Sequence, residues 1–86
     1  MTFDGAIIEE QGVTFGIVVV KSYVLNNQSE CEQMINFGIM AFGKIPIILM
    51  AQNSSGTPTY YGRRDIVNFL SGIFVEQIPW KTYTIN

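Results

Sequence analysis

The segment from Val13 to Leu25 is the sequence feature that most constrains the fold, because both of its sides are apolar. At its centre, Ile17–Val20 is an unbroken run of β-branched residues, which a pleated strand accommodates well. Successive side chains of a strand point to opposite faces of the sheet. One face then carries Val13, Phe15, Ile17 and Val19, and the other carries Val18, Val20 and Val24. Such a strand is expected in the middle of a sheet, covered on both sides, and a second subunit could supply one cover.

Further strands and two helices are expected along the rest of the chain. The additional strands are predicted at Phe3–Glu10, Ile45–Ala51, Pro58–Tyr61 and Lys81–Ile85. The second helix is predicted from Arg64 or Asp65 to about Phe74, because the residues between them carry an apolar stripe at helical spacing. Its members are Ile66, Phe69, Leu70, Ile73 and Phe74.

The first helix is predicted to end at Phe42, where Gly43 provides the usual stop. Two starting points fit the sequence. Ser29 followed by Glu32 has the spacing of a capping box, and Asn27 followed by Glu30 is an alternative cap. The helix is apolar nearly all round, which is typical of a helix buried on more than one side.

The predicted order of elements is ββαββαβ. This order indicates an α+β fold with two layers, in which about five mostly antiparallel strands carry both helices on one face. No shift in composition marks a linker, so residues 1–86 are predicted to form a single domain.

The composition predicts self-association. Hydrophobic residues make up 48% of the chain and charged residues 14%, whereas average soluble chains contain about 25% charged residues. The apolar surplus is expected in a subunit interface, most simply that of a homodimer, built from the spare sheet face and the first helix. The candidate interface residues are Val18, Val20, Phe37, Ile39, Met40 and Trp80.

Charge and residue types exclude several classes of function. The formal net charge of −2 argues against nucleic-acid partners and gives no polybasic signal for a membrane. The absence of histidine removes the commonest general base and the commonest metal ligand, so no catalytic residue, metal or cofactor is predicted. A single cysteine fits a cytoplasmic protein, and Met1–Gly5 does not resemble the start of a signal peptide.

One polar corner stands out as a candidate ligand site. Gly62 precedes the second helix, and two adjacent arginines follow it. Free N–H groups of a first helical turn, together with guanidinium groups, can hold a phosphate or carboxylate. The candidate residues for a small anionic ligand are Tyr60, Tyr61, Gly62, Arg63 and Arg64.

Two other interpretations of this corner remain open. The arginines could be solvated while Asp65 caps the helix, or they could form ion pairs with Glu9 or Glu10 of another subunit.

Cys31 follows a strong strand and lies near the start of a helix, which resembles the nucleophile position of thioredoxin-fold redox proteins. The resemblance would imply redox chemistry at this thiol. The sequence departs from that pattern because no second cysteine is present. Packing on the inner face of the helix is therefore the predicted role of Cys31.

Together these features predict a small, non-catalytic interaction domain that works as a homodimer or as a subunit of a larger complex. The alternative function is binding of a small anionic ligand at the Tyr60–Arg64 corner.

Overall fold

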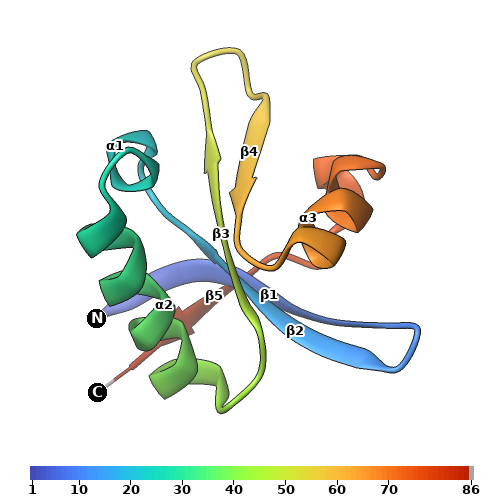
Figure 1. The fold of residues 1–86 in the computed structure, drawn as a ribbon, viewed down its shortest axis with the longest axis horizontal. Coiled ribbons are helices and arrows are strands. Elements are labelled where there is room, and N and C mark those ends of the chain that lie inside the picture. The colour runs from blue at the N-terminus through green and yellow to red at the C-terminus, as the bar shows by residue number, and fades with distance from the viewer. Residues whose placement is uncertain (86) are drawn as a thin grey trace.

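A computed structural model shows five strands, two main helices and two shorter helical turns, and it describes residues 1–85 (Figure 1). The strands are β1 (Thr2–Glu10), β2 (Val13–Val19), β3 (Ile47–Gln52), β4 (Pro58–Tyr61) and β5 (Lys81–Thr84). The helices are α1 (Ser22–Leu25), α2 (Gln28–Phe42) and α3 (Arg64–Ser71), followed by the 3₁₀ turn η1 (Val75–Gln77). The predicted α+β class and the order of main elements are confirmed.

The strands form one mixed sheet in the order β4-β3-β2-β1-β5. Three of the four strand pairs are antiparallel, and β2 runs parallel to β3. A parallel pair needs a long connection between its strands, and α1 and α2 make that connection here. The β1–β2 hairpin closes through Gln11 and Gly12, whose φ angles of 52° and 80° fit a type I′ turn.

The expectation that both helices share one face of the sheet is wrong. Side chains of α2 pack with Val18 and Leu49, whereas side chains of α3 pack with Ile17 and Ile48. Because consecutive residues of a strand face opposite ways, these contacts place the two helices on opposite faces. Figure 1 shows α2 and α3 on either side of β3. The molecule therefore has three layers where two were predicted.

Each face of the sheet has its own apolar core. The buried residues of the α3 side are Ala6, Phe15, Ile17, Ile48, Met50, Ile66, Leu70 and Ile78. Those of the α2 side are Val18, Val24, Cys31, Ile47 and Leu49. The central strand is covered on both sides, as its sequence predicts, and α3 of the same chain supplies the cover that a second subunit could have supplied.

Several boundaries differ from the predicted ones. Strand β2 ends at Val19, and the following residues turn into α1. Helix α2 begins with Asn27 as its cap, because the Asn27 side chain accepts a hydrogen bond from the Glu30 N–H at 3.0 Å. Helix α3 ends at Ser71, three residues before Phe74. Within residues 1–85, every helix is too short or too polar to cross a membrane.

Candidate functional site

The polar corner lies where β4 passes into α3. Gly62 makes this connection with a φ angle of 152°, in the region that favours glycine. A Cβ at this position would lie 2.5 Å from Ile48 Cδ1 and 3.1 Å from the carbonyl oxygen of Ile47. Gly62 is therefore explained by the close passage of the chain beside β3, without any ligand.

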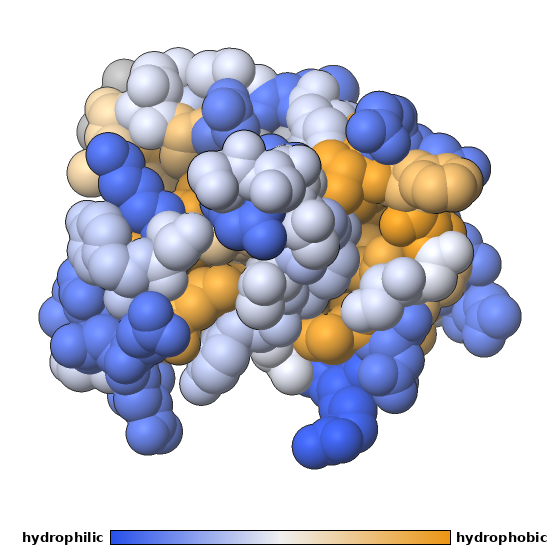
Figure 2. All heavy atoms as spheres, turned by 90° about the horizontal axis from the view of Figure 1, so that it is seen from above, coloured by the Kyte–Doolittle hydropathy of each residue, from blue (hydrophilic) through white to orange (hydrophobic). Residues whose placement is uncertain are grey.

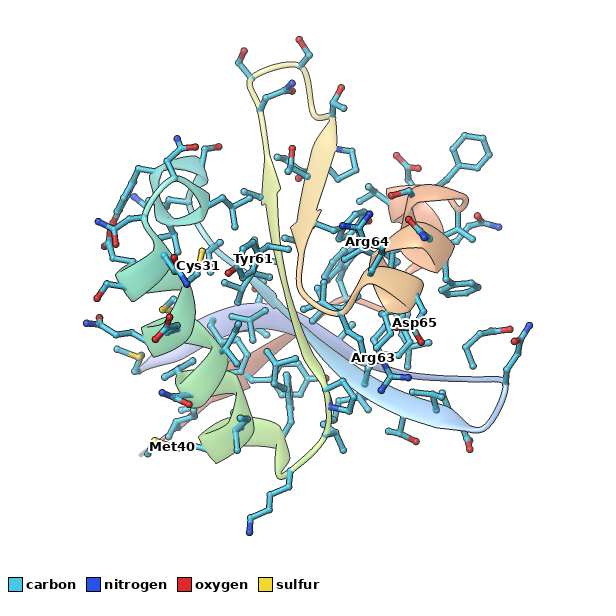
Figure 3. All side chains as sticks on the ribbon, in the orientation of Figure 1. Cys31, Met40, Tyr61, Arg63, Arg64 and Asp65 are labelled. Atoms are coloured by element: carbon cyan, nitrogen blue, oxygen red, sulfur yellow. The ribbon has the colours of Figure 1, made fainter. Side chains whose placement is uncertain are left out.

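The two arginines of this corner have different surroundings. Arg63 holds Asp65 through two hydrogen bonds, from Nε at 2.8 Å and from a terminal nitrogen at 2.9 Å. These bonds raise the pKa of Arg63 and lower the pKa of Asp65. Both side chains are exposed. Within residues 1–85 Arg64 has no ion-pair partner, and Figure 3 shows it apart from the Arg63–Asp65 pair. Of the two, Arg64 is the one whose charge is uncompensated.

The predicted site residues do not all meet. Tyr60 lies opposite Met50 in the β3–β4 ladder and faces the α3 side, whereas Tyr61 lies opposite Leu49 and faces the α2 side. A shallow hollow of about 460 Å³ lies beside both tyrosines at the edge of the sheet. It is lined by Tyr60, Tyr61, Gly62, Arg64, Val67 and Asn68. The structure therefore groups four of the five predicted residues and separates Arg63 from them.

Tyr60 also borders a second hollow, which the sequence did not indicate. The Tyr60 hydroxyl is buried and has no hydrogen-bond partner within the described residues. Burial raises the pKa of Tyr60. The second hollow, of about 400 Å³, lies at the other end of α3. Phe74, which is 75% exposed, and Glu76 are among the residues that line it. The apolar stripe predicted for the second helix gave no signal for this hollow, because Phe74 was predicted to lie on that stripe, whereas α3 ends at Ser71.

Cys31 is a packing residue, as predicted. Its side chain is completely buried, and its thiol donates a hydrogen bond to the carbonyl oxygen of Val24 at 3.2 Å. Burial raises the pKa of the thiol, and the nearby Glu30 and Glu32 carboxylates add to this effect. A thiol with a raised pKa and no access to solvent is a poor nucleophile.

The predicted interface residues occupy very different depths. Val18 is completely buried beneath α2, so it cannot line a contact with another chain. Trp80 is half-buried and donates its indole N–H to the carbonyl oxygen of Val75 at 3.0 Å. Met40 is 79% exposed, and Figure 3 shows it projecting from α2. The others, Val20, Phe37 and Ile39, are half-buried.

An apolar hollow of about 430 Å³ connects some of these residues. It lies between the start of β1, the junction of β2 with α1, and α2. Its apolar lining includes Met1, Phe3, Val20, Tyr23, Met34 and Phe37.

Among residues 1–85, no group of three or more cysteine and acidic side chains is arranged to hold a metal ion. The chain matches no protein-family model, no curated protein and no solved structure.

Proposed function

We propose that this protein is a small interaction domain without catalytic activity, which works as a homodimer or as a subunit of a larger complex. The observation that carries the proposal is the number of large apolar side chains that are exposed to solvent. They are exposed even though helices cover both faces of the sheet. Met1, Ile7, Tyr23, Met40, Tyr61 and Phe74 are each at least 36% exposed. Figure 2 shows apolar atoms reaching the surface in several places between polar ones.

The physical argument is the free energy of burying these groups. Removing apolar surface from water contributes about 25 cal/mol per Å², so an association that covers several of these side chains is favoured. Phe37, Ile39 and Met40 of α2 stay candidates for contact with a further partner. A cytoplasmic location belongs to the same proposal, and the unpaired Cys31 supports it.

Sedimentation equilibrium tests the proposal on the unmodified chain. We expect the mean mass to rise from that of the 9.7 kDa chain toward twice this value as the concentration increases through the micromolar range. A mass that stays at the monomer value up to about 0.5 mM, well above the range of specific complexes, would contradict self-association.

Binding of a small anion is the second candidate function. The observation that favours it is the uncompensated charge of Arg64 beside the hollow that Tyr60 and Tyr61 border. A guanidinium group recognises phosphate and carboxylate through paired hydrogen bonds, and an aromatic ring can stack on a neighbouring ring of the ligand.

A thermal-shift screen with inorganic phosphate and phosphorylated metabolites tests this function. A binding compound should raise the melting temperature of the wild type and lose its effect in Arg64→Ala. Arg63→Ala is the matched control, because Asp65 already occupies the Arg63 guanidinium. Equal shifts in the wild type and in Arg64→Ala would rule out this site.

A further inference from the structure

The apolar hollow between β1, α1 and α2, called the α1 hollow below, lies where the helices leave the start of β1 partly uncovered. Lys21, in an extended conformation, turns the chain from β2 into α1. Helix α1 then packs on β3, and α2 packs on β2 and β3. The first residues of β1 lie beyond these main contacts, where the ring of Phe3 packs against Phe37 of α2 with 5.0 Å between the ring centroids. In Figure 1 the N-terminus, α1 and α2 lie on the same side of β3.

The residues that line the α1 hollow range from a buried floor to an exposed rim. Val24 is 7% exposed, whereas Phe3 and Met34 are half-buried and Tyr23 is 61% exposed. An apolar ligand in the hollow would contact side chains of β1, α1 and α2 at once and lose water on several sides. The volume of about 430 Å³ falls within the range of about 300–1,000 Å³ that is usual for small-molecule sites.

Lys21 is the single charged side chain in the lining of the α1 hollow. It is exposed, and it has no ion-pair partner within residues 1–85. A lysine can lay its methylene groups along an apolar surface while its ammonium group stays in water. The hollow therefore combines an apolar surface with one uncompensated positive charge at its rim.

From this combination we infer that the α1 hollow binds an apolar carboxylate, of which a medium-chain fatty acid is the simplest example. The hydrocarbon tail lies against Phe3, Val24 and Met34, and the carboxylate faces the Lys21 ammonium group. Met34 suits such a tail, because its unbranched side chain adapts to irregular apolar surfaces. The α1 hollow shares no lining residue with the hollow beside Arg64, so this inference does not depend on either proposed function.

Both parts of the ligand are needed to match the site. A small anion such as phosphate would gain only an exposed ion pair with Lys21, and such pairs contribute little. A hydrocarbon without a charge would leave the ammonium group without a partner. The tail supplies most of the affinity, since each methylene that is fully buried tightens binding about fourfold. The carboxylate fixes the orientation of the tail relative to Lys21.

A titration of the ¹⁵N-labelled chain with sodium octanoate, followed by nuclear magnetic resonance, tests the inference. We expect saturable shifts at the backbone amides of Phe3, Tyr23 and Phe37, with a dissociation constant below about 1 mM. Hexanoate should bind about four- to fifteenfold more weakly, because it lacks two methylene groups. A titration without saturation up to about 10 mM octanoate, or equal binding of both acids, would overturn the inference.

Two lysine variants test the role of the charge. Lys21→Glu should raise the dissociation constant of octanoate about three- to tenfold, because it replaces attraction by repulsion. The variant should fold, since the Lys21 side chain is exposed and makes no capping hydrogen bond to α1. Lys44→Glu is the matched control, because Lys44 is also exposed and lies outside the hollow. Equal weakening by both variants would show a long-range charge effect and overturn the assigned contact.

Octanol separates the tail from the head group without a change in the tail. Because octanol carries no charge, Lys21→Glu should leave its dissociation constant within about twofold of the wild-type value. If Lys21→Glu weakens octanol as much as octanoate, the variant has altered the hollow itself, and the proposed contact between carboxylate and ammonium group is wrong.

Two further outcomes separate this inference from the proposed functions. Arg64→Ala should leave octanoate binding unchanged, and a loss of binding in this variant would place the ligand at the Tyr60–Arg64 corner instead. Octanoate affinity should also be independent of protein concentration. An affinity that falls as the dimer forms in sedimentation equilibrium would identify a second copy of the chain as the occupant of the hollow.

Discussion

Two glycines near α3 have opposite structural roles. Gly62 has a φ of 152° and passes close to Ile48, whereas Gly72 has a φ of −93° and the nearest atom to a Cβ there would be 3.5 Å away. We expect Gly62→Ala to lower the free energy of unfolding by about 2 kcal/mol or more, through strain and a clash. Gly72→Ala should raise it by about 0.4–1 kcal/mol, because it restricts the unfolded chain. Urea denaturation measures the free energy of unfolding of both variants. Equal destabilisation by Gly72→Ala and Gly62→Ala would contradict the opposite roles of the two glycines.

The Cys31 thiol predicts how stability depends on pH. Burial raises its pKa in the folded state above the unfolded value of about 8.5, so the folded state holds the proton more tightly. Its contribution is complete below about pH 8.5 and is lost as the pH rises toward the folded-state pKa. Cys31→Ala should therefore destabilise the protein by about 1 kcal/mol at neutral pH, and the difference from the wild type should shrink above about pH 8.5.

Iodoacetamide labelling provides a second measurement on the same residue. The native thiol should react far more slowly than the unfolded one, because the side chain is completely buried. Rapid labelling of the native protein would show that the thiol is accessible. So would a difference in the free energy of unfolding between Cys31→Ala and the wild type that stays constant with pH.

The pairing of Arg63 with Asp65 could not be predicted from the sequence, whereas the burial of Cys31 could. Arg63 and Asp65 are two positions apart, and nothing in their spacing indicates that they pair with each other. That pairing depends on the extended backbone of Arg63 just before the helix, where φ is −57° and ψ is 127°. The burial of Cys31 was predictable, because its place on the apolar face of a helix depends only on helical periodicity.

At the scale of elements, the cap of α2 can be tested directly. The Asn27 side chain accepts a hydrogen bond from the Glu30 N–H, whereas Ser29 lies within the helix as its second residue. Asn27→Ala should lower the free energy of unfolding by about 1 kcal/mol, and Ser29→Ala should change it by less than about 0.5 kcal/mol. Chemical denaturation of the two variants distinguishes the caps that the sequence left open. A larger effect of Ser29→Ala would identify Ser29 as the cap.

Elements were predicted more accurately than their arrangement. The strands and main helices are set by local patterns, such as the run Ile17–Val20 and the stripe of α3, and these appear close to their expected positions. The side of the sheet on which each helix packs is a tertiary property. The apolar residues on both faces of β2 indicated that two covers were needed, but the same pattern arises whether a helix or another subunit supplies the second cover.

At the scale of the whole molecule, one sheet connects two apolar cores. Adjacent residues of the central strands enter different cores, as Ile48 and Leu49 do in β3. Neither helix layer can therefore lose its packing without exposing one face of the same two strands. This arrangement favours cooperative unfolding, although the cores share no side chains.

The cooperativity can be measured with two probes that report on different layers. Trp80, the single tryptophan, packs against the core on the α3 side, whereas far-UV circular dichroism is dominated by α2 on the other side. At one fixed protein concentration, tryptophan fluorescence and circular dichroism should give the same urea midpoint.

Removing side chains from either core should move both probes together. Leu70→Ala acts on the α3 side and should lower the free energy of unfolding by about 2–5 kcal/mol. Val24→Ala is the counterpart on the α2 side, with a smaller expected loss of about 1–3 kcal/mol because fewer methyl groups are removed. A fluorescence midpoint that falls in Leu70→Ala while the circular dichroism midpoint stays at the wild-type value would show that the α3 layer unfolds separately. In that case α2 would stay packed on the sheet after α3 has unfolded, and the two cores would be independent units of stability.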